Sequence, residues 1–360
     1  MRRMFAAGIL NAIGAPLMAA LAGCSGGNAA LDASIGSDAM GPNAATIVDL
    51  PNGAAGIGLD DLRYSAGLGR IVVPAGRTGN VDLVDPATLV VTSFGGFTSA
   101  AQFDGSDQQG VESADEGGGL VFGNDRSAFK LGVVDPLAQM MVASVQLERT
   151  EPDYVRYVQS THEVWITNPG MSRIEVLSVP ATGTPIPTHA AFIDVPGGVE
   201  GLTIDDTRHQ AYTHLFAGAV AVVDIRTRAV VANWPTGCAS SHGIPALDDR
   251  LGWLFAGCSS ARTVVLDIDH GGAQLGSYTL GPGPTILAYS PSLRHLYIRG
   301  DGYPQVAVLQ VSPLGALSLL GMVSATPKGH CMTADDRGNF WVCDWQMGRL
   351  LRFQDPYPGA

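Results

Sequence analysis

Charge is scarce in this chain. Only 15% of the 360 residues are Asp, Glu, Lys or Arg, and Lys130 and Lys328 are the only lysines. A disordered chain needs high charge and little apolar surface, whereas 46% of these residues are hydrophobic. Positive charge is scarcest, because 21 basic residues face 33 acidic ones and the net charge is −12. This balance argues against a nucleic-acid partner, since binding a phosphate backbone requires a basic surface.

Sequence motifs of the common catalytic classes are also missing. The chain has no nucleophile elbow, phosphate-binding loop, zinc-protease motif or haem attachment motif. Glycines 117–119 precede a predicted strand and not a helix, so they do not indicate a nucleotide-binding loop. Glycine is abundant instead, with 46 residues, and many glycines with few charges are typical of short strands joined by tight turns.

The first 23 residues have the pattern of an export signal. Arg2 and Arg3 precede an apolar stretch of small residues with no stop-transfer flank, which indicates a cleaved signal peptide and not a membrane span. The stretch ends in Leu21-Ala22-Gly23-Cys24, which resembles the bacterial lipobox. The alternative is an ordinary secretory signal followed by a chance cysteine.

The lipobox resemblance implies that signal peptide 1–23 is removed and that Cys24 is lipidated, so that acyl chains anchor the protein in a membrane. Ser25 stands where inner-membrane lipoproteins carry Asp, which implies the outer membrane of the bacterial cell envelope. Residues 24–45 are small, polar and aperiodic, and we interpret them as a flexible tether.

A repeat runs through the rest of the chain. Each copy has a short strand with a bulky residue near its start, then a glycine-containing turn and a strand rich in Val, Ile and Leu. The bulky residues lie 42 to 50 residues apart, at Val72, Phe122, Trp165, Tyr212, Leu254, Tyr297 and Trp341. This period matches one four-stranded propeller blade, and the repeats of a β-solenoid are shorter. The sequence therefore predicts an all-β, seven-bladed β-propeller over residues 46–356.

Closure of the ring is predicted as well. The seventh copy ends after its third strand, near Phe353, and the segment 45–51 (ATIVDLP) has the pattern of the missing outer strand. An N-terminal strand in the last blade would cover two otherwise free sheet edges.

The repeats resemble the YVTN-type seven-bladed propellers. Val164-Trp165-Ile166-Thr167-Asn168 is the copy most similar to the Tyr-Val-Thr-Asn core of that superfamily. The superfamily includes surface-layer, lipoprotein, lactonase-like and quinoprotein-like propellers, so the resemblance implies a fold but no particular activity.

Four cysteines remain after Cys24, and an even number in an exported protein indicates two disulfides. Of the three possible connectivities, one fits the repeat, because it places both partners across one inner hairpin. We therefore expect Cys238–Cys258 and Cys331–Cys343, both at the same end of their blades.

The start of each innermost strand predicts the lining of the channel mouth. One residue per blade falls at this register, in the order Arg63, Glu112, Asp153, Glu200, His242, Thr285 and His330. Glu112, Asp153, Glu200, His242 and His330 together form a candidate ligand or metal ring, because converging carboxylates and imidazoles bind divalent cations such as calcium. The alternative is a polar ring that only hydrates the channel.

Two functional readings follow from these patterns. The favoured one is an envelope lipoprotein whose propeller is a binding or scaffold module without catalysis, with an envelope protein or a small molecule as its ligand. The second is a metal-dependent hydrolase or lyase of the lactonase-like kind, with its site at the channel mouth. No cofactor signature supports an electron-transfer quinoprotein.

Overall fold

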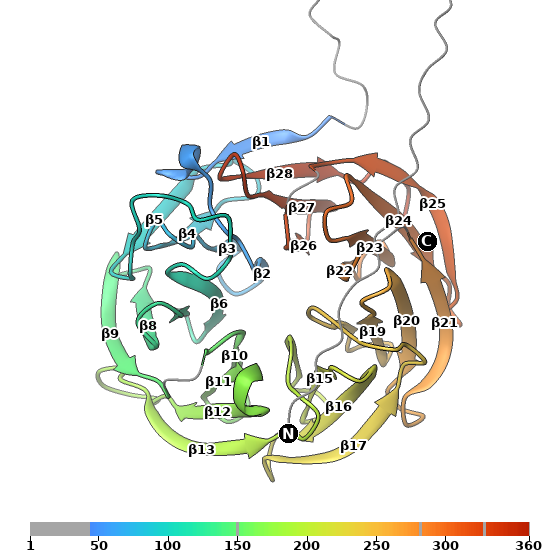
Figure 1. Ribbon diagram of the computed structural model, residues 1–360, viewed down its shortest axis with the longest axis horizontal. Coiled ribbons are helices and arrows are strands. Elements are labelled where there is room, and N and C mark those ends of the chain that lie inside the picture. The colour runs from blue at the N-terminus through green and yellow to red at the C-terminus, as the bar shows by residue number, and fades with distance from the viewer. Residues whose placement is uncertain (1–43, 149–150, 281–282, 327–328, 360) are drawn as a thin grey trace, which may run out of the picture. The chain divides into compact units, whose positions relative to one another are not determined.

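The computed structural model describes residues 44–148, 151–280, 283–326 and 329–359. Its 28 strands form seven antiparallel sheets of four strands each, arranged as blades around a central axis (Figure 1). The predicted all-β, seven-bladed propeller is confirmed. The signal peptide and Cys24 lie outside the described residues. Within these residues no helix is long and apolar enough to cross a membrane.

Each blade is built from four consecutive strands, and the first of the four is innermost. The first three blades contain β2 (Arg63–Ser65), β3 (Arg70–Pro74), β4 (Asn80–Val84) and β5 (Val91–Gly95); β6 (Val111–Gly117), β7 (Leu120–Asp125), β8 (Lys130–Asp135) and β9 (Met140–Gln146); and β10 (Val155–Val158), β11 (Glu163–Asn168), β12 (Arg173–Ser178) and β13 (Thr188–Asp194). The next three contain β14 (Leu202–Asp205), β15 (Gln210–Leu215), β16 (Ala219–Asp224) and β17 (Ala229–Pro235); β18 (Ala246–Asp248), β19 (Trp253–Gly257), β20 (Arg262–Asp267) and β21 (Ala273–Thr279); and β22 (Thr285–Ser290), β23 (His295–Gly300), β24 (Gln305–Val311) and β25 (Leu317–Ser324). Blade 7 contains β26 (Met332–Ala334), β27 (Asn339–Asp344) and β28 (Arg349–Gln354). Two short 3₁₀ turns, η1 (Gly53–Ala55) and η2 (Pro169–Met171), complete the elements of the described residues.

The outer strand of blade 7 comes from the other end of the chain. Strand β1 (Thr46–Asp49) pairs antiparallel with β28, with Thr46 opposite Arg352 and Asp49 opposite Arg349. Val48 and Leu50 are buried beneath this strand, so closure also covers apolar surface. The predicted closure by an N-terminal strand is therefore confirmed.

The repeated bulky residues form the core between blades. All seven lie on the second strand of a blade, and each is fully buried. The buried apolar side chains gather in seven clusters within the described residues, one at each junction of neighbouring blades. The strict repeat in the sequence thus reflects a blade-to-blade packing position that recurs seven times.

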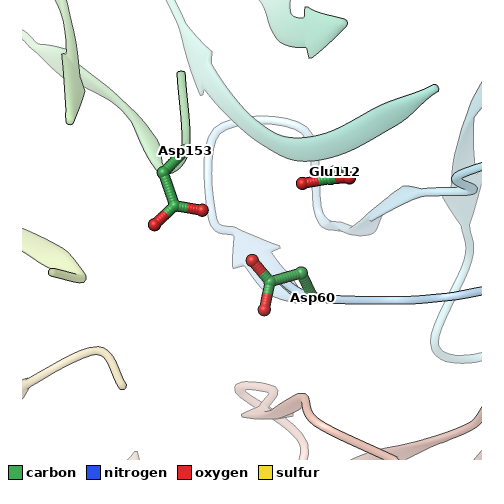
Figure 2. Close-up of side chains that lie close together, drawn as sticks. All are labelled: Asp60, Glu112 and Asp153. Carbon is green, nitrogen blue, oxygen red and sulfur yellow. The ribbon is translucent and has the colours of Figure 1, made fainter. Parts of the chain in front are cut away.

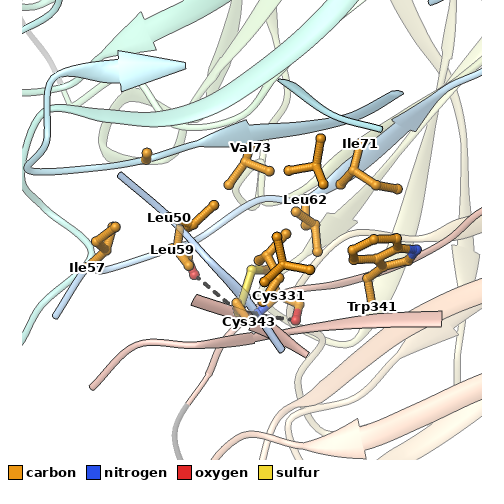
Figure 3. Close-up of a cluster of buried hydrophobic side chains, with 13 residues drawn as sticks. Leu50, Ile57, Leu59, Leu62, Ile71, Val73, Cys331, Trp341 and Cys343 are labelled. Carbon is orange, nitrogen blue, oxygen red and sulfur yellow. Dashed lines mark hydrogen bonds between the residues drawn. A yellow bond between two sulfur atoms is a disulfide. The ribbon is translucent and has the colours of Figure 1, made fainter. Parts of the chain in front are cut away.

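The junction between blades 7 and 1 also holds a disulfide. Trp341, Ile71 and Val73 pack there around the Cys331–Cys343 bond (Figure 3). The second disulfide, Cys238–Cys258, joins the segment before β18 to the residue that follows β19. The structure thus has the two pairings expected from the repeat, both at the end of the blades where the inner strands begin.

Candidate functional site

The starts of the inner strands surround one end of the channel, which we call the mouth. Glu112 is the second residue of β6, and Asp153 and Glu200 lie two residues before β10 and β14. His330 lies two residues before β26, and His242 lies four residues before β18. The structure therefore brings the five ring residues expected from the sequence to the same end of the propeller, where contacts join them in two groups.

The first group consists of three carboxyl groups. One oxygen each from Asp60, Glu112 and Asp153 lies within 4.8 Å of the others, and all three residues are buried. Figure 2 shows the three groups entering a common space from separate segments of chain. The guanidinium of Arg126 borders this space and donates to Glu112 Oε2 at 2.7 Å and to Asp153 Oδ1 at 3.2 Å.

The second group pairs two imidazoles with acidic side chains. The Nε2 atoms of His242 and His330 lie 3.3 Å apart, and the two rings are nearly perpendicular, at 86°. His242 Nδ1 is 3.4 Å from Glu200 Oε1. His330 joins the two groups, because its Nε2 is also 3.6 Å from Asp60 Oδ1.

Burial and mutual repulsion raise the pKa of every mouth carboxyl group. Burial, opposed by Arg126 but supported by Asp60, raises the pKa of Glu112 to about 10. Burial and the charge of Asp60 raise the pKa of Asp153 to about 8. Burial also raises the pKa of Asp60 to about 7, against the attraction of His330, and that of Glu200 to about 7. Negative charge is therefore hard to accumulate here unless a cation compensates it.

The two histidines are shifted in opposite directions. Burial and the positive charge of His330 lower the pKa of His242 to about 4. Burial alone would lower the pKa of His330 as well, but Asp301 and Asp60 outweigh it and raise that pKa to about 9. At neutral pH the pair therefore holds one proton, with a neutral His242 able to accept from a cationic His330.

Two residues predicted for the ring lie elsewhere. Arg63 Nε pairs with Asp115 Oδ1 at 2.9 Å, deeper along the channel. Thr285 is buried, and its hydroxyl donates to the carbonyl of Cys258 at 3.0 Å. In blade 1 the mouth position is occupied by Asp60, because the chain runs three further residues before β2 begins.

Sequence reasoning also missed Arg126 and Tyr154. Arg126 follows β7, the second strand of blade 2, and Tyr154 donates its hydroxyl to Asp60 Oδ1 at 3.2 Å. The adjacent acids Asp60-Asp61 before β2 were a usable signal, since Asp153 likewise precedes β10. Nothing in the repeat pointed to Arg126, because its position depends on how blades 2 and 3 meet.

Aromatic side chains border the histidines on one side. The Trp345 ring lies 6.2 Å from that of His330, and Phe103 packs edge-on against Trp345 at 6.4 Å. Trp345 is held by a 2.7 Å hydrogen bond from its indole to the carbonyl of Leu59. Phe216 is 45% exposed and packs beside Gly198, two residues before Glu200. The mouth thus combines buried acidic groups with an apolar border.

The channel narrows directly below the mouth. The cavity lined by Asp60, Tyr154, Ile244, Ile286 and Met332 measures only about 20 Å³. A ligand of more than a few atoms that reaches the mouth carboxylates must therefore enter from the mouth side.

A buried ion pair crosses the channel beyond this constriction. Arg156 Nη1 lies 2.7 Å from Asp61 Oδ2, and both side chains are about 1% exposed. Ser113 donates to the same Asp61 oxygen at 2.6 Å, and Arg156 Nε donates to the carbonyl of Leu202 at 2.9 Å. These contacts tie together the inner strands of blades 1 to 4. The Asp61–Arg156 pair has its partners satisfied by the protein, so we assign it a structural role.

The far end of the channel is wider. A cavity of about 330 Å³ in the channel is followed by one of about 410 Å³ lined by Arg63, Tyr64, Asp115, Glu116 and Asp206, among others. Its charged side chains are mostly paired with one another or with backbone groups, as in the Arg63–Asp115 contact. The mouth therefore holds the more concentrated set of ligand-binding groups.

Comparison with known proteins supports the fold and nothing narrower. No protein-family profile and no curated protein matches the sequence. Among solved structures the chain is similar to one titled Kuenenia stuttgartiensis Hydrazine Synthase, with a TM-score of 0.65 and 13% identity over 84% of this chain and 96% of that one. A chain from a structure of the Mitotic Checkpoint Complex gives a TM-score of 0.69 and 14% identity over 92% and 99% of the two chains. The WD40 β-propeller domain of Doa1 gives 0.65 and 11% over 88% and 98%.

These identities are low enough that they establish architecture alone. The protein is a seven-bladed β-propeller, and propellers serve as binding or scaffold modules as well as enzymes. Its function must be argued from the mouth.

Proposed function

We propose that this protein is a lipid-anchored component of the bacterial outer membrane whose YVTN-type propeller binds a ligand at the channel mouth without transforming it. The lipobox at residues 21–24 and the tether up to residue 45 support the anchoring. Two disulfides support an oxidising compartment such as the periplasm, because cytosolic proteins rarely keep them.

The observation that carries the binding role is the convergence of Asp60, Glu112, Asp153, Glu200 and His330 on one narrow space. These residues come from five blades, so only the closed ring brings them together. Buried polar side chains that converge beside an apolar border are typical of a ligand site. The constriction below the mouth supports docking from one face.

A thermal-shift screen tests this function. Full-length protein in detergent is heated with a panel of organic amines, sugars, amino acids and short peptides, and the unfolding midpoint is recorded. A true ligand should raise the midpoint of the wild type but not that of the Glu200→Gln/His330→Ala double variant. Asp249→Asn, which alters the lining of the far cavity, should respond like the wild type. A ligand whose effect survives the mouth variant and is lost in Asp249→Asn would overturn the assignment.

A second candidate function is a metal-dependent hydrolase or lyase of the lactonase-like kind. The observation that favours it is the same carboxylate group next to a histidine pair that holds one proton, because a metal and a proton carrier are the two parts such chemistry requires. Hydrolysis of a lactone panel, measured with and without added Ca²⁺, Mn²⁺ or Zn²⁺, separates the two functions. Turnover that Glu112→Gln abolishes while the fold is retained would establish the catalytic alternative.

A further inference from the structure

We infer that Asp60, Glu112 and Asp153 form a binding site for one divalent cation that prefers oxygen ligands, calcium or manganese. The inference rests on the proposed ligand site at the mouth and specifies the chemical class of what that site binds. It adds Asp60, from the segment before blade 1, to the ring residues predicted from the sequence, and it leaves His242 outside the first set of ligands.

The geometry suits a single ion. Calcium binds oxygen at roughly 2.3–2.6 Å, so two oxygens on one ion are at most about 5 Å apart. One oxygen from each of the three carboxyl groups lies within 4.8 Å of the other two, which meets this limit before any adjustment. The three groups come from separate segments of blades 1, 2 and 3 and enter the same space (Figure 2).

An unsatisfied atom points independently to a ligand. The Glu112 side chain is fully buried, and its Oε1 accepts no hydrogen bond within the described residues. Its other oxygen is used by Arg126. A buried carboxylate oxygen left without a donor is destabilising, and a bound cation would satisfy it.

The charge balance favours a cation as well. Six carboxyl groups interact at the mouth, from Asp60, Asp107, Glu112, Asp153, Glu200 and Asp301. Arg126 and a protonated His330 are the cationic groups that these interactions identify within the described residues. If every acid ionises, the acids exceed the cations by four. A divalent ion among the three most crowded carboxylates removes the largest part of this repulsion.

The ligand set indicates which ion binds. Three carboxylates without a nitrogen or sulfur atom among them favour calcium, magnesium or manganese over zinc. Magnesium demands near-ideal octahedral geometry, whereas calcium tolerates irregular sets of oxygens such as this one. We therefore expect calcium and manganese to bind more tightly than magnesium or zinc.

Calorimetry with the metal alone tests the inference. Full-length protein is treated with a chelator, exchanged into metal-free buffer at pH 7.5, and titrated with CaCl₂, MnCl₂, MgCl₂ or ZnCl₂. We expect one site per chain in the wild type and at least about tenfold weaker calcium binding in Glu112→Gln, which keeps the shape of the side chain. Calcium should raise the unfolding midpoint of the wild type by more than that of the variant.

The matched control is Asp82→Asn. Asp82 is equally buried, but it lies on β4, the third strand of blade 1, outside the mouth. This variant should bind calcium as the wild type does. Asp60→Asn provides a second ligand variant in case Glu112→Gln does not fold, as judged by circular dichroism.

Two results would overturn the cation site. One is the absence of heat and of any midpoint shift in the wild type with all four ions. The other is unchanged affinity in both Glu112→Gln and Asp60→Asn, which would place the ion elsewhere. Either result leaves the organic-ligand screen above unaffected, so failure of the cation site and failure of the binding module are told apart.

Discussion

His242 and His330 face each other across the channel mouth with their Nε2 atoms 3.3 Å apart, although 88 residues separate them in the chain. Each is held close to a disulfide. Cys331 directly follows His330, and Cys258 follows Gly257, whose carbonyl accepts a 3.3 Å hydrogen bond from the His242 amide. The covalent links therefore lie beside the two imidazoles of the site.

Removing the blade 7 disulfide should destabilise the protein. Cys331→Ala/Cys343→Ala releases a short loop and leaves a gap between blades 7 and 1, so we expect the free energy of unfolding to fall by about 2–4 kcal/mol. Urea unfolding of the oxidised proteins measures the difference. Non-reducing peptide mapping of the wild type provides the control, and a Cys238–Cys331 peptide would contradict the connectivity on which the prediction rests.

The closing strand gives a second stability test. Deleting residues 45–50 removes the partner of β28 and the buried side chains of Val48 and Leu50, each worth about 1.5–3 kcal/mol. We expect the thermal midpoint to drop sharply, because a free sheet edge is also exposed. Deletion of residues 25–40 is the control and should leave the midpoint unchanged. Equal midpoints for the two deletions would show that the ring does not depend on β1.

Lipidation is tested at Cys24. Cys24→Ser should abolish labelling by radioactive palmitate and release the protein from membranes into the soluble fraction, because the acyl chains would be its attachment. Cell fractionation with density-gradient separation of the two membranes measures both the anchoring and the predicted outer-membrane location. A variant that still sediments with membranes and takes up fatty acid would rule out this assignment.

Arg126 is predicted to stabilise the metal-free mouth. Its guanidinium bonds two buried carboxylates, so Arg126→Met should lower the free energy of unfolding by roughly 3 kcal/mol at pH 7.5. Added calcium should recover part of this loss, because the ion supplies the missing positive charge. Arg208→Met is the control, since Arg208 pairs with the 55% exposed Asp269 and such pairs contribute only about 0–1 kcal/mol. Equal losses in the two variants, or no recovery with calcium, would contradict the role given to Arg126.

Asp82 should make stability fall as the pH rises. Burial raises the pKa of this carboxyl group from 3.8 to about 6, against a lowering by Ser93, and neither oxygen has a well-formed hydrogen bond within the described residues. The folded state therefore favours the protonated form. This contribution is fully present below the unfolded pKa near 3.8 and is lost as the pH rises through about 6.

Replacing Asp82 with the neutral Asn should remove that pH dependence. We expect Asp82→Asn to be more stable than the wild type by about 1–3 kcal/mol at pH 8, with the difference shrinking toward pH 4. Urea unfolding at pH 4, 6 and 8 measures it. A difference that is constant across the three values would mean that Asp82 does not titrate in this range.

The sequence alone determined the architecture, because seven copies of a buried second-strand residue can be read directly from their spacing. Trp165, Tyr297 and Trp341 recur since every blade packs against the next in the same way. Val48 and Leu50 marked the closing strand by their alternation with exposed residues, and the cysteine spacing selected one connectivity. All of these features depend on local pattern or on the repeat.

The tertiary structure decided which side chains share the mouth. Glu112, Asp153 and His330 could be aligned from the repeat, but Asp60 could not, because the segment before β2 departs from the period by three residues. Arg126 and Tyr154 reach the carboxylates only through the way neighbouring blades are turned toward one another. Electrostatic environment follows the same rule, since the pKa of a buried acid depends on which charges the ring places within a few ångströms of it.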